Sequence, residues 1–285
     1  MSRWLVTGAG GMLGQDVLTQ LSTAGMEASA LTRADLDVTD PDATRDAVAG
    51  HDVVVNCAAY TNVDGAETDE AGAFAVNATG AANLASACAA AGARLVHVST
   101  DYVFAGQASS PYAEDYPLAP RSAYGRTKAA GEWAAVAGCP RTWVVRTAWL
   151  YGAGGPNFVT TMARLAGERE TLQVVDDQIG QPTWTRDVAD AIVRLVVQEA
   201  PFGMWHATSQ GETSWHGLAQ QVFRGLGLDP ERVQPVSTSE FPRPAPRPAY
   251  SVLGHDRWLA ASLPLLPRWQ DALATALPRV VPGTP

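Results

Sequence analysis

A tyrosine and a lysine four residues apart form the pair with the clearest catalytic potential. Tyr124 and Lys128 lie in the run Tyr-Gly-Arg-Thr-Lys, within an Ala-rich stretch that predicts a helix. Residues four apart share one face of a helix, so both side chains can reach a common ligand. A phenol with an ordinary pKa of about 10 is a weak acid-base catalyst at neutral pH, and a nearby ammonium lowers that pKa. We expect Tyr124 to exchange a proton with a substrate.

The composition supports a role for Lys128, although the Tyr-x-x-x-Lys pattern also arises often by chance. The chain has 20 Lys and Arg residues, and Lys128 is its only lysine. An ammonium is a compact charge and a guanidinium is a broad planar fork, so the two are not interchangeable in a crowded site. We expect Lys128 to bind a ribose and to lower the pKa of Tyr124.

A third candidate follows a predicted strand at residues 95–99. Thr100 lies at the carboxyl end of this strand, which is the edge where α/β sheets bind ligands. Its hydroxyl can hydrogen-bond and polarise a substrate carbonyl. The alternative is that Thr100 only caps the turn that follows. We expect Thr100, Tyr124 and Lys128 to form the catalytic group.

A glycine-rich loop near the N-terminus predicts a dinucleotide site. The run Thr-Gly-Ala-Gly-Gly-Met-Leu-Gly connects the first predicted strand to the first predicted helix. In this position Gly8 allows a tight turn, Gly11 lets the backbone approach a pyrophosphate, and Gly14 permits close packing of helix on strand. A glycine-rich turn by itself is weak evidence, but one that opens a β-α-β unit favours cofactor binding.

Residues after the next strands indicate which cofactor binds. The second predicted strand ends at Arg33, and a cation there suits the 2′-phosphate of NADPH, whereas an acidic residue would favour NADH. Asp37 can accept a hydrogen bond from an adenine amino group, and the small residues at 57–60 let the backbone lie along the cofactor. Arg33 as a surface residue and Asp37 as a plain turn residue are the alternatives. We predict a preference for NADPH with some use of NADH.

The elements that position these residues alternate along the first 150 residues. This alternation predicts repeated β-α units and a doubly wound parallel sheet of the Rossmann type. Residues 1–150 are predicted to form the NADP-binding domain, with a return segment around 176–200, and residues 151–285 to be mainly a smaller substrate-binding domain. The strands are expected at 4–7, 28–32, 53–56, 95–99 and 143–146. The helices are expected at 13–24, 41–48, 71–91 and 124–137.

Composition excludes several classes of protein. The formal net charge is -9, which argues against DNA or RNA binding because that requires clustered cations. No apolar run approaches the roughly 20 residues of a membrane span. The glycine loop begins too early for a signal peptide, so we expect a cytoplasmic protein. The three cysteines are odd in number and widely spaced, and they predict buried thiols.

With these residues in place, the chain resembles the dTDP-4-dehydrorhamnose reductase family of extended short-chain reductases over nearly its whole length. The segments that carry the resemblance are the glycine loop, 36–40, 99–104, Tyr124-x-x-x-Lys128, 146–151, 177–183, 213–216 and Arg247-Pro248. The resemblance implies that Thr100, Tyr124 and Lys128 are catalytic, and that the sugar contacts Thr100, Asp101 and Trp149, with Arg247 also on the substrate. It implies that the cofactor is lined by Gly11, Met12, Leu13, Asp37, Val38, Ala58, Ala59 and Tyr60.

One departure from the family pattern concerns Tyr250, where many relatives have Asn, so that substrate contact is not carried over. Some relatives bind a metal at a dimer interface. Those ligands cannot be matched position by position, and Asp16 alone does not build a site. We therefore predict no metal.

The resemblance implies reduction of dTDP-4-dehydro-L-rhamnose to dTDP-L-rhamnose. The same chemistry on another dTDP-4-keto-6-deoxyhexose is an alternative that the sequence does not separate. A non-catalytic NADP-binding regulatory subunit is a further alternative, and Trp149 argues against it because such relatives lack this residue. A monomer and a homodimer both stay open.

Overall fold

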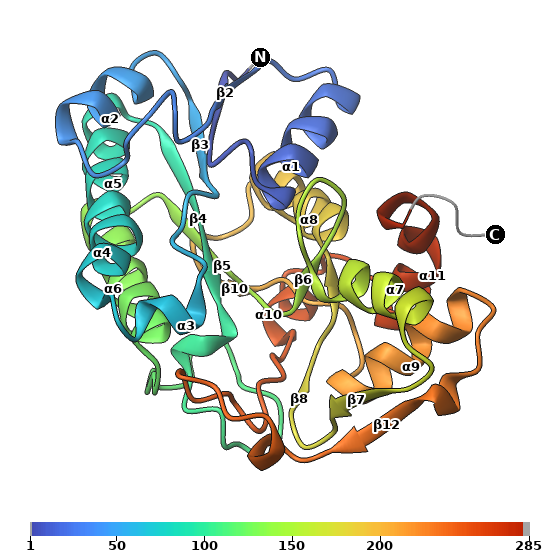
Figure 1. The fold of residues 1–285 in the computed structure, drawn as a ribbon. Helices are drawn as coiled ribbons and strands as arrows, with labels where there is room; N and C mark the ends of the chain where they lie inside the picture. The colour runs from blue at the N-terminus through green and yellow to red at the C-terminus, as the bar shows by residue number, and fades with distance from the viewer. Residues whose placement is uncertain (1, 282–285) are drawn as a thin grey trace.

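A six-stranded parallel sheet forms the centre of the molecule, and the computed structural model describes residues 2–281 (Figure 1). The strand order is β10-β5-β4-β3-β1-β2. From β1 the chain proceeds to β2 on one side and then to β3 on the other, so the winding reverses between β1 and β3. In open α/β sheets ligands bind at the carboxyl ends of the strands beside such a reversal.

The structure contains the following elements, with short 3-10 turns between some of them. The strands are β1 (Trp4–Thr7), β2 (Ala28–Leu31), β3 (Val53–Asn56), β4 (Arg94–Thr100), β5 (Thr142–Thr147), β6 (Leu150–Tyr151), β7 (Leu172–Val175), β8 (Ile179–Gly180), β9 (Thr183–Trp184), β10 (Gly203–His206), β11 (Thr213–Ser214) and β12 (Val233–Val236). The helices are α1 (Met12–Thr23), α2 (Pro41–Val48), α3 (Val63–Ala66), α4 (Glu70–Phe74), α5 (Gly80–Ala91), α6 (Ala123–Gly138), α7 (Phe158–Glu168), α8 (Thr185–Val197), α9 (Trp215–Gly225), α10 (Asp256–Ala260) and α11 (Trp269–Val280).

Helices cover both faces of the sheet because its central strands are apolar on both sides. Val6 and Val55 point to the face covered by α1 and α8. Leu5 and Val54 alternate with them and pack against α2, α5 and α6 on the opposite face. Figure 1 shows the two helical layers on either side of the sheet. The predicted doubly wound α/β fold of the Rossmann type is confirmed.

The predicted helix at 71–91 is confirmed as a continuous helical segment, but five of its residues form a π-helical turn. The structure has α4, then a π-helical turn at Ala75–Thr79, then α5. The wider turn contains Asn77, whose side chain accepts a hydrogen bond from Tyr60 N at 2.8 Å and donates to Tyr60 O at 3.2 Å. It also donates to Thr127 Oγ1 at 3.0 Å. Hydrogen bonds to distant backbone therefore shape this segment, and an Ala-rich pattern does not reveal them.

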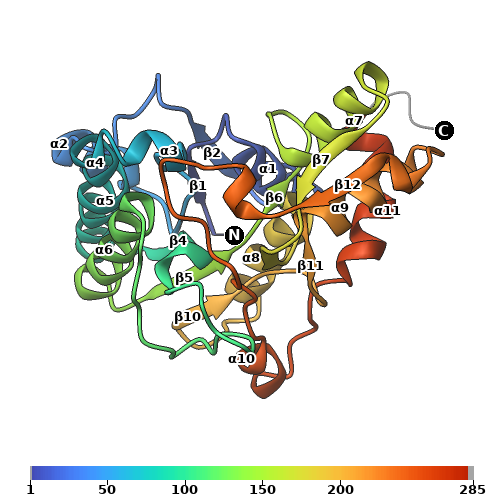
Figure 2. The same ribbon diagram turned by 60° about the horizontal axis from the view of Figure 1, so that its bottom comes forward.

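A second, smaller apolar core lies beside the sheet (Figure 2). Helices α7, α9 and α11 surround it, together with the parallel pair β7 and β12. Val159, Leu218, Phe223 and Leu273 are buried in this core. Nearly all of this core comes from residues 151–281, where the substrate-binding domain was expected.

The division at residue 150 stays a prediction, and the chain passes repeatedly between the two cores. Helix α8 lies within the expected return segment 176–200 and packs against α1. Strand β10 lies beyond that segment and extends the main sheet by pairing with β5. Residues 282–285 of the second expected domain lie outside the described residues. Within residues 2–281, no helix is long and apolar enough to span a membrane.

Candidate active site

A cavity of about 630 Å³ lies at the carboxyl ends of the central strands and reaches the start of α9. Most of the predicted site residues line it, namely Gly8, Gly11, Met12, Leu13, Ala59, Thr100, Asp101, Tyr124, Lys128 and Trp149. The remaining ones are not part of its lining, namely Arg33, Asp37, Val38, Ala58, Tyr60 and Arg247. The structure thus brings the three predicted catalytic side chains together with the glycine loop in one cavity.

The glycine loop approaches its neighbours so closely that side chains would not fit. Gly8 has φ +65°, and a Cβ added to it would lie 2.6 Å from Ala58 N. A Cβ on Gly14 would lie 2.5 Å from Gly8 O. Gly11 is the N-cap of α1 and provides no side-chain cap, so the first amides of the helix are available to a ligand. This cradle fits a pyrophosphate, because the positive end of a helix and free amides favour an anion.

Tyr124 and Lys128 are held by helix α6. Ser122 caps this helix and accepts a hydrogen bond from Gly125 N at 3.0 Å, which fixes where the first turn begins. Tyr124 lies in that turn and Lys128 lies one turn later, so both face the cavity. Lys128 Nζ donates a hydrogen bond to Val98 O in β4 at 2.7 Å. The ammonium is therefore anchored to the strand that ends at Thr100.

The surroundings of Lys128 lower its pKa to about 8, mainly because the ammonium is buried. Glu132, one turn further along α6, acts in the opposite direction and raises it. Both carboxylate oxygens of Glu132 accept hydrogen bonds from Arg146, at 2.9 and 2.8 Å, in an ion pair with almost no exposure. Sequence reasoning missed the Glu132–Arg146 pair, which joins residues 14 apart on different elements.

The expected lowering of the pKa of Tyr124 is not what the structure shows. Burial in the cavity wall raises the pKa of the phenol to about 12, and the Asp101 carboxylate raises it further. A hydrogen bond with Thr100 acts in the opposite direction but is outweighed. The phenol of Tyr124 is consequently protonated at neutral pH. This protonation state suits a side chain that donates a proton.

Thr100 caps the turn that follows it and also faces the cavity, so its contact with a substrate carbonyl stays a prediction. Its hydroxyl accepts a hydrogen bond from Tyr102 N at 3.2 Å, which caps the following turn, and donates to Asp101 Oδ1 at 2.9 Å. It also lines the cavity beside Tyr124. Asp101 is buried, and burial raises its pKa to about 6. The Ser251 and Thr100 hydroxyls hydrogen-bond to this carboxylate and act against that rise.

Arg33 and Asp37 lie on the surface beyond the cavity. Arg33 follows β2, beside the glycine loop, where Ala9 N donates to Leu31 O at 3.1 Å. Asp37 Oδ1 accepts hydrogen bonds from the amide and the hydroxyl of Thr39, at 2.9 and 2.8 Å. These two bonds lower the pKa of Asp37 and show that it stabilises its own turn. Contacts of either residue with a cofactor stay predictions.

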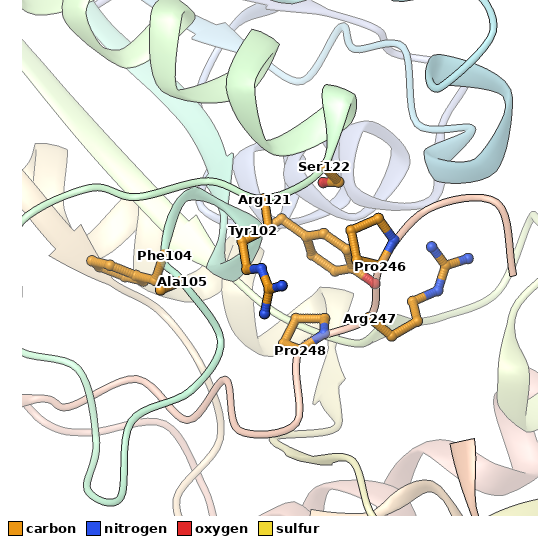
Figure 3. A pocket seen from close by; sticks show the side chains of 8 residues that line it. All are labelled: Tyr102, Phe104, Ala105, Arg121, Ser122, Pro246, Arg247 and Pro248. Carbon is orange, nitrogen blue, oxygen red and sulfur yellow. The ribbon is translucent and has the colours of Figure 1, made fainter. Parts of the chain in front are cut away.

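Arg247 lies in the Pro-rich segment 241–248 and is bound to a carboxylate. Its Nη2 donates to Asp64 Oδ2 in α3 at 2.9 Å, and Ala245 N donates to Asp64 Oδ1 at 3.2 Å. Figure 3 shows Pro246 beside the ring of Tyr102, while the guanidinium of Arg247 points away from that ring. The segment therefore packs next to Tyr102, and the expected contact of Arg247 with substrate stays a prediction.

Two stacked tryptophans form the aromatic part of the cavity wall. Trp149 follows β5, and Trp215 begins α9. Their ring centroids are 3.5 Å apart and the ring planes differ by 7°. Trp215 lies within the segment 213–216 that resembles the family, but the sequence alone gave it no role.

Within residues 2–281 no group of three or more His, Cys, Asp or Glu side chains is arranged to hold a metal ion.

Comparison with known proteins places these features in context. Residues 2–281 match the family model described as RmlD substrate binding domain. The chain is 52% identical over 295 residues to a dTDP-4-dehydrorhamnose reductase of Streptomyces griseus, covering 99% of this chain and 97% of the relative. It is 51% identical to a probable dTDP-4,6-dihydroxy-2-methyloxan-3-one 4-ketoreductase of Streptomyces antibioticus, covering 98% of this chain and 96% of the relative.

A solved structure is similar over the whole fold. The dTDP-4-dehydrorhamnose reductase of Bacillus anthracis, in complex with NADP, aligns with a TM-score of 0.94 and 36% sequence identity. The alignment covers 98% of this chain and 99% of that one. The similarity therefore includes both the main sheet and the segments of the second core.

Proposed function

Because the chain belongs to the RmlD substrate binding domain family, that of the dTDP-4-dehydrorhamnose reductases, we propose that it reduces the C4 ketone of dTDP-4-dehydro-L-rhamnose with NADPH to give dTDP-L-rhamnose. The observation that carries the proposal is the meeting of Thr100, Tyr124 and Lys128 with the glycine loop in one cavity. A cradle for a pyrophosphate and a proton donor beside a carbonyl-binding hydroxyl are the parts that a ketoreductase needs.

Each residue of the catalytic group has a separate task. When bound, NADPH supplies the hydride that C4 of the sugar receives. In the free protein the Thr100 hydroxyl donates its one proton to Asp101 Oδ1, and with substrate bound it would turn to donate to the C4 carbonyl oxygen and orient it. Tyr124, which is protonated at neutral pH, gives its proton to that oxygen as it becomes a hydroxyl. Lys128 holds the ribose hydroxyls through its ammonium and keeps a positive charge near the oxygen that gains electrons.

Different residues would hold different parts of NADPH. Gly8, Gly11 and the start of α1 would hold the pyrophosphate. A side chain at Gly8 would collide with the backbone of Ala58, so this turn of the loop requires glycine. Arg33 would pair with the 2′-phosphate, and Asp37 with the adenine amino group. Ala59 would lie against the cofactor from the end of β3. The likeness to a structure that contains NADP supports this assignment.

Reduction of another dTDP-linked 4-keto-6-deoxy sugar is the second candidate. The relative from Streptomyces antibioticus, named as a ketoreductase for a different sugar, is 51% identical to this chain. The catalytic group would act identically on either substrate. A non-catalytic binding subunit is the weakest reading, because the cavity presents Trp149 beside a complete catalytic group. A cytoplasmic location and a monomeric or homodimeric state stay predictions.

Analysis of the product distinguishes the two sugar candidates. The purified protein is incubated with dTDP-4-dehydro-6-deoxyglucose, NADPH and the 3,5-epimerase, and the sugar formed is identified by NMR. We expect dTDP-L-rhamnose. A product that forms equally without the epimerase would favour another 4-keto sugar as the substrate. No oxidation of NADPH with any dTDP-linked 4-keto sugar would reject the proposed activity.

A further inference from the structure

The backbone of Trp149 is held in a conformation that few residues with a side chain adopt. Its φ is +47°, one of three positive values at non-glycine positions among the described residues. A bulky residue in the left-handed region costs about 1 to 3 kcal/mol and persists only where its surroundings impose it. Trp149 lines the cavity with Thr100 and Tyr124, so whatever imposes this conformation also sets the shape of the site.

The contacts of Trp149 indicate what holds its backbone in this left-handed conformation. One face of its indole is stacked on Trp215, and Trp149 also contacts the segment around β8 and β9. A Cβ on Gly180 would lie 2.5 Å from Trp149 Cε2, so this glycine leaves room for the ring. Trp149 O accepts a hydrogen bond from Thr183 N at 3.2 Å. Of these contacts among the described residues, the stack on Trp215 is the one that presents a broad, flat surface to the indole.

Trp215 is itself held in place from other directions. Its Nε1 donates a hydrogen bond to Gln178 Oε1 at 3.2 Å, and Gln178 Nε2 donates to Thr238 Oγ1 at 2.9 Å. Phe158 packs against the same indole, with centroids 4.7 Å apart. Both indoles pack against the second core, Trp215 from the start of α9 and Trp149 from the segment that follows β5 of the main sheet. The stacked pair joins the two regions at the cavity wall.

We propose that Trp215 is a positioning residue for sugar-nucleotide binding. By stacking on the Trp149 indole, it holds Trp149 in its left-handed backbone conformation and so fixes the aromatic surface that the substrate meets. The substrate class rests on the proposed function. Stacking covers one face of Trp149, so the substrate meets its other face or its edge. Trp215 contributes through Trp149 and is not placed at the reacting atoms.

Kinetic analysis of two substitutions tests the positioning role. Trp215→Leu removes the flat surface, and Trp215→Phe keeps an aromatic ring but loses the N–H. For Trp215→Leu we expect the KM for the dTDP-linked 4-keto sugar to rise roughly 3- to 10-fold, the scale of one aromatic pair. The kcat and the NADPH affinity should change little. Trp215→Phe should recover most of the KM.

A double-mutant cycle shows whether Trp215 acts through Trp149. Trp149→Ala and Trp215→Leu remove opposite halves of the stack, so their effects on KM should be far from additive. Phe158→Leu is the matched control, because it loses a contact with Trp215 and leaves the stack in place. Additive effects, an unchanged KM in Trp215→Leu, or equal losses of melting temperature, NADPH affinity and KM would overturn the proposal.

A spectroscopic measurement separates this inference from the proposed function. Two stacked indoles whose transition moments are rotated against each other within the stack give an exciton couplet in the far-ultraviolet circular dichroism. We expect the same part of this signal to disappear in Trp149→Phe and in Trp215→Phe, and to persist in Trp133→Phe, which alters an exposed indole on α6. If wild type reduces no dTDP-linked 4-keto sugar, the proposed function fails and the couplet alone decides whether the stack exists. A couplet unchanged by Trp215→Phe would overturn the stack.

Discussion

The two walls of the cavity are built in different ways. The catalytic wall takes Thr100 from the end of a buried strand and Tyr124 and Lys128 from a capped helix. The substrate wall takes Trp149 from a residue with positive φ and Trp215 from the first turn of a helix in the second core. Regular elements define the reacting geometry on one side, and contacts between separate segments define the binding surface on the other. Substitutions on the first wall should mainly affect kcat, and those on the second mainly KM.

Tyr124→Phe is the sharpest test of the catalytic wall. It removes the proton donor and leaves the ring in place, so kcat should fall by about 100-fold or more, the usual scale of general acid catalysis. NADPH affinity, measured by fluorescence titration, should stay near that of wild type. A variant that keeps more than about a third of wild-type turnover would exclude proton donation by Tyr124.

Lys128→Arg should lose most of the activity although it conserves the charge, because a planar fork does not fit the space that a compact ammonium occupies. We expect kcat to fall by roughly 10-fold or more in this variant. Bound NADPH should also protect Lys128 from amine-modifying reagents, with the N-terminal amine as the internal control. An arginine variant that turns over like wild type would leave the single lysine without a catalytic role.

The pH dependence of wild type follows from the lowered pKa of Lys128. This group is charged below about 8 and neutral above it. In the proposed mechanism the charged form is the active one. The kcat/KM should therefore decrease as the pH rises through about 8. Tyr124, with a pKa of about 12, stays protonated throughout this range and does not cause the decrease. A profile of the residual activity of Lys128→Arg should lack the step, and its persistence there would assign it to another group.

Trp149→Ala examines the substrate wall. The KM for the sugar nucleotide should rise by about 10-fold, because the variant loses one aromatic surface. NADPH affinity should be nearly intact, since the glycine loop lies on the other part of the cavity. Equal losses of sugar-nucleotide binding, NADPH binding and melting temperature would instead indicate that Trp149 serves only the packing of the protein.

Arg33→Ala is expected to have the smallest effect. An exposed ion pair contributes up to about 1 kcal/mol, so the KM for NADPH should rise by about 5-fold. The KM for NADH should hardly change, because NADH lacks the 2′-phosphate. The ratio of the two KM values is the measurement, and equal changes for both cofactors would remove Arg33 from the site.

The sequence predicted the parts of the protein that depend on local pattern. The strands of the first 150 residues, the glycine loop, and the shared cavity of Thr100, Tyr124 and Lys128 follow from apolar runs, glycine positions and helical spacing. The π-helical turn around Asn77 and the pairing of Arg247 with Asp64 do not, because they join segments far apart in the chain. The direction of the pKa shift of Tyr124 also depends on burial, which spacing does not reveal.

The order of the strands has a consequence for how the chain folds. Strand β10 completes the main sheet, and α8 covers the apolar face of α1, although both follow a long excursion into the second core. During synthesis, the first 150 residues therefore emerge with one face of the sheet incompletely covered. Contacts between such distant segments slow folding. A nascent chain that ends before α8 should expose Val6, Val55 and the inner side of α1, and it would need protection from aggregation until α8 arrives.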